Sequence, residues 1–127
     1  MRKLLIAMLS TTLMLSASVM AQDLAGDMDI LKGAYRTVQK TNDKAEMVRA
    51  LTDMRAAAEN AKTQAPDQLK GQAADSAGMK DYRAELDTLV GQIDASLKLA
   101  TSGDLAGAKE EAKNFSATRD AGHKKFR

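Results

Sequence analysis

Apolar residues recur at helical spacing along four stretches of this 127-residue chain. The first stretch follows Asp23, a residue type that caps helix N-termini. Its apolar positions are separated by alternating steps of four and three residues, which places them on one face of an α-helix. These positions are Leu24, Met28, Leu31, Tyr35 and Val38.

The second stripe opens at Asp43, which together with Glu46 three residues later has the pattern of a capping box. Residues 63–75 follow it without any period and hold Pro66 and Gly71, so we predict a loop whose length is typical of functional loops. The apolar positions of the second stripe are Met47, Leu51, Met54, Ala58 and Ala61, with Val48 at its edge.

The third and fourth stripes are separated by Ser102, Gly103 and Asp104. Gly103 suits the left-handed position after a helix, and Asp104 suits the cap of the next one. Ser76 can cap the third helix, inside which Gly91 lies at some local cost. The third stripe is Met79, Tyr82, Leu86, Leu89, Ile93, Leu97 and Ala100. The fourth is Leu105, Ala108, Ala112, Phe115, Arg119, Gly122 and Phe126.

Four amphipathic helices and no predicted strand indicate an all-α fold. The connections between the first and second helices and between the third and fourth are short, which makes each pair antiparallel. We therefore predict an up-down-up-down antiparallel four-helix bundle. In that topology the start of the first helix and the end of the fourth meet at one end of the bundle, which the loop of residues 63–75 closes.

Residues 1–21 have the pattern of a cleaved export signal. Met1, Arg2 and Lys3 form a basic start, residues 4–15 an apolar run broken by hydroxyls, and residues 19–21 a small-residue cleavage site. A membrane-spanning helix needs about 20 strongly apolar residues, which this run does not supply. We predict a single mature domain, residues 22–127, located in the periplasm without stable membrane insertion.

Cleavage of this segment would remove two of the 19 basic residues and none of the 17 acidic ones, so the mature charge is close to zero. With a balanced charge and no Trp, the domain lacks the basic surface and the stacking platform of a nucleic-acid binder. The absence of Cys excludes disulfides. The domain must therefore be stabilised by packing, or by packing and a ligand.

His123 is the only histidine of the chain, and it lies near the end of the fourth helix. At 1.5 Å per residue, Met28 and His123 both lie roughly 6 to 8 Å from the same end of the predicted bundle. His123 follows Ala112 by eleven residues, which leaves it about 20° from the direction of Ala112. We therefore expect Met28 and His123 both to point inward and to face each other across the core.

An imidazole and a thioether suit few kinds of site. A closed zinc site needs three or four protein ligands and a di-iron bundle needs two histidines, whereas haem iron needs two axial ligands. A covalent haem is excluded, because Arg119 and Gly122 stand where Cys-x-x-Cys-His has cysteines. The residues expected to line this end are Leu24, Leu31, Met54, Ala58, Met79, Tyr82, Leu86, Gly122 and Phe126.

From spacing alone, two alternatives stay open beside a non-covalent b-type haem. Met28 can be an ordinary core residue of a haem-free helical binding or chaperone-like protein. A gas-binding bundle cytochrome is the other alternative, against which Met28 argues, because a second axial ligand leaves no open position at the iron.

The chain resembles the cytochrome b562 family along its whole mature length. The resemblance is strongest in five segments: ALTDMRAAA (residues 50–58), MKDYR (79–83), LVGQID (89–94), LKLA (97–100) and TRDAGHKKFR (118–127). It implies a periplasmic electron-transfer protein that binds one non-covalent haem b and is not an enzyme. We expect a monomer that exchanges electrons with redox partner proteins.

The resemblance also implies roles for individual residues. Met28 and His123 match the axial ligands, and Arg119 and Arg127 match basic residues close to the haem. Three further positions match pocket-lining residues of the family: Met54, Pro66 and Tyr82. The chain departs from the family in having Leu86 and Gly122 in place of aromatic residues and Asp67 after Pro66, and we expect these departures to change haem affinity.

Overall fold

The computed structural model describes residues 23–126, and four helices carry its fold. They are α2 (Leu24–Lys40), α3 (Lys44–Ala61), α4 (Ala77–Thr101) and α5 (Leu105–Phe126). No strand occurs within these residues. The prediction of an all-α chain is confirmed, whereas the predicted export signal and Arg127 lie outside the described residues.

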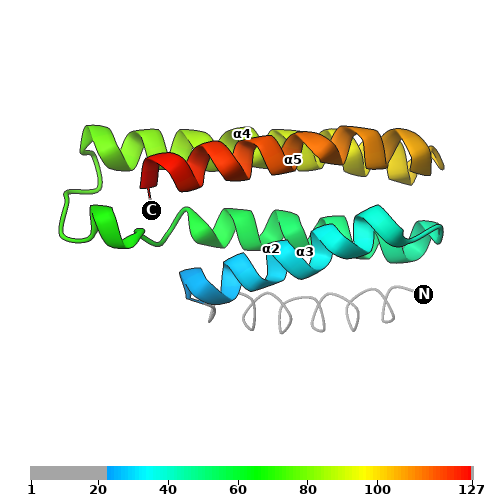
Figure 1. The fold of residues 1–127 in the computed structure, drawn as a ribbon, viewed down its shortest axis with the longest axis horizontal. Coiled ribbons are helices and arrows are strands. Elements are labelled where there is room, and N and C mark those ends of the chain that lie inside the picture. Colours follow the sequence, from blue (N-terminus) through cyan, green and yellow to red (C-terminus); the bar gives the residue numbers. More distant parts are fainter. Residues whose placement is uncertain (1–22, 127) are drawn as a thin grey trace, which may run out of the picture.

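The helices run alternately up and down, as predicted (Figure 1). The pairs α2/α3, α3/α4 and α4/α5 pack extensively, whereas α2 and α5 contact each other sparsely. The beginning of α2 and the end of α5 lie at the same end of the bundle, on the left of Figure 1. This end is the one that the sequence analysis selected for a site.

The connection between α3 and α4 closes that end of the bundle. It contains a short 3-10 helix, η1 (Asp67–Leu69), which the sequence analysis did not predict. Leu69 is buried in the core and η1 contacts α5, so the connection is held by packing. Pro66, directly before η1, is also buried.

The core follows the predicted stripes of α3 and α4 closely. Met47, Leu51 and Ile93 are fully buried, and the stripes of α2 and α5 join them at Val38 and Phe115. The stripe of α5 is interrupted at Arg119, which is exposed and whose guanidinium pairs with Asp120, whereas Phe126 packs against the core again. Placing Arg119 on the buried face was therefore wrong.

The predicted helix caps are confirmed except for one detail. The Asp23 carboxylate accepts a hydrogen bond from the Gly26 amide at 2.8 Å, and the Asp43 carboxylate accepts one from the Ala45 amide at 3.3 Å. Glu46, however, accepts from the hydroxyl of Thr41, whose oxygen also accepts from the Asp43 amide. The reciprocal capping box does not form, because the buried Thr41 takes both partners.

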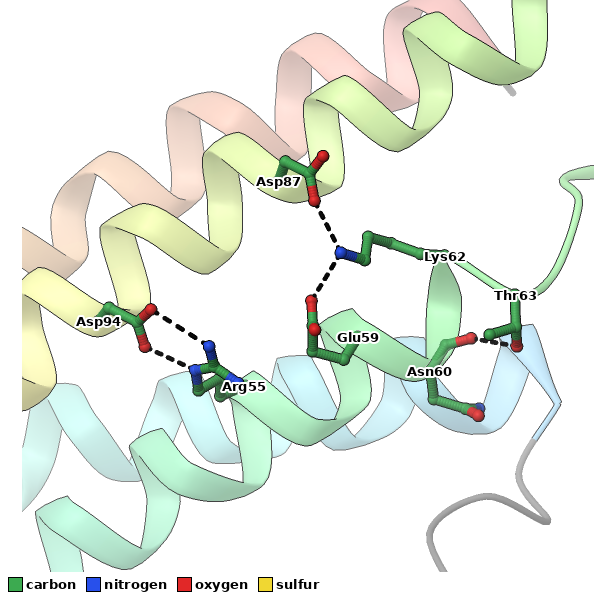
Figure 2. A network of polar contacts seen from close by, with 7 residues as sticks. All are labelled: Arg55, Glu59, Asn60, Lys62, Thr63, Asp87 and Asp94. Carbon is green, nitrogen blue, oxygen red and sulfur yellow. Dashed lines mark hydrogen bonds and ion pairs between the residues drawn. The ribbon is translucent and has the colours of Figure 1, made fainter. Parts of the chain in front are cut away.

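Ion pairs on the surface join α3 to α4 (Figure 2). Arg55 donates to Asp94 at 2.6 Å, and Lys62 pairs with Glu59 at 2.8 Å and with Asp87 at 2.7 Å. Exposed pairs of this kind contribute about 0.2 to 1 kcal/mol each. They support the α3/α4 packing, while the buried stripes supply most of its stability.

No helix within residues 23–126 is both long enough and apolar enough to cross a membrane.

The turn between α4 and α5 generates a testable prediction. Gly103 has φ +94°, and an added Cβ would meet no atom within 4 Å, so only backbone strain opposes a substitution there. We expect Gly103→Ala to lower the free energy of unfolding by about 1 to 2 kcal/mol in urea denaturation.

Gly91 is the matched control for this prediction, because a Cβ added there also meets open space. Gly91 lies inside α4, so Gly91→Ala should raise the free energy of unfolding by about 0.5 to 1 kcal/mol. Equal effects of the two substitutions would contradict the assigned role of the Gly103 backbone.

Candidate functional site

The alignment of α2 with α5 is defined by contacts around Tyr35. The rings of Tyr35 and Phe115 lie 6.2 Å apart, and the Ser116 hydroxyl donates to the Tyr35 hydroxyl at 3.5 Å. Moving seven residues back along α2 leads from Tyr35 to Met28. The same step forward along the antiparallel α5 leads from Phe115 and Ser116 to Gly122 and His123. The structure therefore brings Met28 and His123 to the same level of the bundle.

The burial of these two side chains differs from the sequence-based expectation. Met28 is partly buried and packs against the core, but His123 is exposed. Ala112, which lies about 20° from the direction of His123, is fully buried. The direction of the side chain around α5 therefore does not explain why His123 is exposed while Ala112 is buried. His123 is exposed because α2 and α5 pack too sparsely for α2 to cover it.

Partly buried apolar side chains surround this level of the bundle. Leu24 and Leu31 of α2 and Phe126 of α5 pack against the core without being covered by it. Phe126 meets the ring of Tyr82 edge to face, with 5.6 Å between the ring centroids. At the level of Met28 and His123, α2 and α5 thus present apolar side chains that are only partly covered.

Tyr82 connects three helices beneath this surface. It belongs to α4, its ring contacts Phe126 of α5, and its hydroxyl donates to the carbonyl of Ala61 in α3 at 2.8 Å. Burial of the side chain, followed by the negative charge of Asp27, raises the pKa of Tyr82 to about 12. The hydroxyl therefore stays protonated and donates throughout the physiological range.

A buried polar pair, not predicted from the sequence, lies beside Met28. Asp27 is fully buried, and its Oδ2 accepts a hydrogen bond of 2.8 Å from Nδ2 of Asn60. Burial raises the pKa of Asp27, the hydrogen bond from Asn60 partly offsets this effect, and the charge of Asp23 adds to it. Helical spacing could have found Asp27, because it lies three residues after Leu24 and four before Leu31, on the apolar face.

The site offers few donors for a metal. Within residues 23–126, no group of three or more His, Cys, Asp and Glu residues is arranged to hold a metal ion. α2 and α5 bring one thioether, that of Met28, and one imidazole, that of His123, to this level of the bundle.

Comparison with known proteins identifies the family. The sequence model of the family described as cytochrome b562 matches residues 23–127. The chain belongs to the cytochrome b562 family. Two curated proteins of Yersinia pestis are similar over the full length of both chains: "Probable soluble cytochrome b562 2", at 40% identity, and "Probable soluble cytochrome b562 1", at 32%. The resemblance noted in the sequence is thereby confirmed.

The pocket residues that the cytochrome b562 resemblance implies are only partly brought together. Tyr82 lies at the site, and Met54 is buried in α3 about 9 Å deeper than Asn60 along the helix. Arg119 is exposed and also donates to the Ser116 hydroxyl at 3.3 Å. Leu86, which replaces an aromatic residue of the family, is buried.

Gly122 is the second departure from the family pattern. A Cβ added at this position would meet no protein atom within 4 Å. No neighbouring residue of the described chain fills the space beside the Gly122 backbone, where the family has an aromatic side chain. The α5 surface next to His123 is therefore open.

The raised pKa of Tyr82 predicts a loss of stability in alkali. Below pH 10, about the pKa of tyrosine in the unfolded chain, the phenol is neutral in both states and contributes no pH dependence. Between pH 10 and 12 the unfolded chain loses the proton and the folded chain retains it, so stability falls by about 2 to 3 kcal/mol in total.

Tyr82→Phe tests this prediction by urea denaturation across that pH range. The variant should be about 1 kcal/mol less stable than wild type at neutral pH, because it lacks the hydrogen bond to Ala61. The difference should shrink and then reverse as the pH rises. Parallel pH profiles of the two proteins would contradict the raised pKa, because they would show that the phenol has the same pKa in the folded and unfolded chains.

Proposed function

We propose that this chain is a periplasmic electron-transfer protein that binds one non-covalent b-type haem, with Met28 and His123 as its axial ligands. The observation that carries the proposal is the antiparallel alignment at Tyr35 and Phe115, which brings the thioether and the imidazole to the same level. Membership of the cytochrome b562 family supports it independently.

The side chains at this end of the bundle fit such a group. His123 contributes a neutral imidazole nitrogen, and Met28 contributes a soft sulfur that favours ferrous iron and raises the reduction potential. The partly buried Leu24, Leu31 and Phe126 offer an apolar surface for the faces of the porphyrin. When bound, haem supplies reversible one-electron chemistry between Fe(III) and Fe(II).

The same residues explain why the proposal is for a carrier and not for an enzyme. With Met28 and His123 both bound to the iron, no position would remain there for a substrate. Because His123 is exposed, a group that it binds lies close to the surface, within reach of a redox partner protein. The proposed carrier acts as a monomer, and its partners are other redox proteins.

Acid should weaken the proposed site through His123. Protonation of the imidazole removes the lone pair that binds iron, whereas the Met28 sulfur has no proton to gain.

Export to the periplasm is part of the proposal. The pattern of residues 1–21 supports it, and the family match begins at residue 23, next to the predicted start of the mature chain. The protein recovered from a periplasmic fraction should therefore begin at Gln22, which intact-mass measurement can determine. Recovery of the uncleaved chain would contradict this part of the proposal.

Two substitutions test the ligands directly. His123→Ala should lose most of the haem, because the remaining sulfur is a weak ligand by itself. Met28→Ala should retain a five-coordinate haem of lower potential, because the imidazole remains. Haemin titration followed by absorption, together with potentiometry, measures both properties.

Met47→Leu is the matched control, since Met47 is fully buried at the beginning of α3 and a Met-to-Leu change conserves volume. This variant should bind haem as wild type does. Equal haem content and equal potential in all four proteins would refute the ligand assignment. A wild-type protein that shows no Soret change with haemin would instead support a haem-free helical binding protein.

A further inference from the structure

Asp27 is the only charged side chain that is buried within residues 23–126. It lies in the first turn of α2, where Leu24 and Met28 are only partly buried, yet Asp27 itself is fully buried. One carboxylate oxygen accepts from Asn60 of α3, and the other is buried and has no hydrogen-bond partner within residues 23–126.

Stability alone does not account for this residue. A buried carboxylate with one unsatisfied oxygen loses its hydration without full compensation. Replacement of such buried polar pairs by apolar side chains of similar volume is often neutral or stabilising. The hydrogen bond between Asp27 and Asn60 therefore calls for an explanation other than its contribution to the folding free energy.

The directions of side chains around α2 supply that explanation. Met28 precedes Tyr35 by seven residues and thus points within about 20° of it, and Tyr35 contacts α5. Asp27 precedes Val38 by eleven residues and points within about 20° of it, and Val38 is fully buried in the core. An anchor at Asp27 therefore determines which way Met28 faces.

The beginning of α2 needs such an anchor. The first amides of a helix lack partners within the helix, and the Asp23 cap, which binds the Gly26 amide, is local to α2. The sparse packing between α2 and α5 holds this end weakly. The hydrogen bond from Asn60 connects it to α3, which is packed extensively against α2.

We infer that the hydrogen bond between Asp27 and Asn60 is a positioning device, which fixes the rotation of the first turns of α2 so that the Met28 thioether faces His123. The inference rests on the proposed function, because it assigns Asp27 and Asn60 to the geometry of the sulfur ligand. Neither residue binds the iron itself.

The experiment separates positioning from stability by exchanging the two polar groups. Asp27→Leu and Asn60→Leu each remove the hydrogen bond. The double variant Asp27→Asn with Asn60→Asp restores it with donor and acceptor exchanged and with the same total charge. All proteins are loaded with haemin, and the share of sulfur-ligated, low-spin haem is measured by absorption and magnetic circular dichroism. Urea denaturation of the same proteins without haemin measures stability.

We expect each single variant to lower the ratio of sulfur-ligated to five-coordinate haem about tenfold, the size of effect usual for residues that orient a metal ligand. The exchanged pair should return this ratio to within about twofold of wild type. In the absence of haemin, each single Leu variant should lose stability, because it leaves one buried polar group without its partner. The double variant Asp27→Leu with Asn60→Leu removes both polar groups and should be about as stable as wild type, so that its loss of ligation is not a consequence of unfolding.

Asp29→Asn is the control, because it removes a carboxylate equally close to Met28 in sequence but exposed to solvent. It should leave the ligation unchanged. Wild-type ligation in both single Leu variants would overturn the inference, as would losses of ligation that merely follow losses of stability. Failure of the exchanged pair to restore ligation would overturn it as well. Absence of sulfur ligation in wild type would instead overturn the proposed function.

Discussion

The contact between α2 and α5 through Tyr35 and Phe115 is the constraint on which the candidate site depends. These two helices are the first and last of the bundle, and they pack more sparsely than the other neighbouring pairs. One ring contact and one hydroxyl pair nevertheless define their antiparallel alignment. Because each residue of an α-helix advances the chain by the same rise, seven residues from this contact along each helix lead to Met28 and to Gly122 and His123, which places them at about the same level.

The end of the bundle with the candidate site contains two hydrogen bonds between helices beside its apolar contacts. Tyr82 joins α4 to α3 through the Ala61 carbonyl and meets Phe126 of α5, while Asp27 joins α2 to Asn60 of α3. The middle of the bundle relies instead on close-packed apolar residues such as Leu51 and Ile93. This division leaves apolar surface partly uncovered at the site, where a flat ligand can use it.

Most of the fold could be predicted because its signals are local. The stripes determine which face of each helix is buried. Ser76 and Asp104 cap the beginnings of α4 and α5 through hydrogen bonds to amides three residues later. Gly103, with its positive φ, follows the end of α4. The prediction failed where a residue beyond the local pattern intervened. Thr41 forms hydrogen bonds with the two groups that the expected capping box would have joined. Leu69 of the short helix η1 packs in the core, so part of the predicted loop is ordered.

The sequence by itself determined the four helices and their alternating directions. It also determined that Met28 and the only histidine lie near the same end of the bundle, because helical periodicity and rise are properties of the backbone. Only the tertiary structure decided that His123 is exposed and that Asp27 is buried against Asn60. Burial depends on what lies opposite a side chain, which for His123 is the sparse packing of α2 against α5 and for Asp27 the close approach of α3. Such distances between helices are set by the packing of the whole core, and no single stripe encodes them.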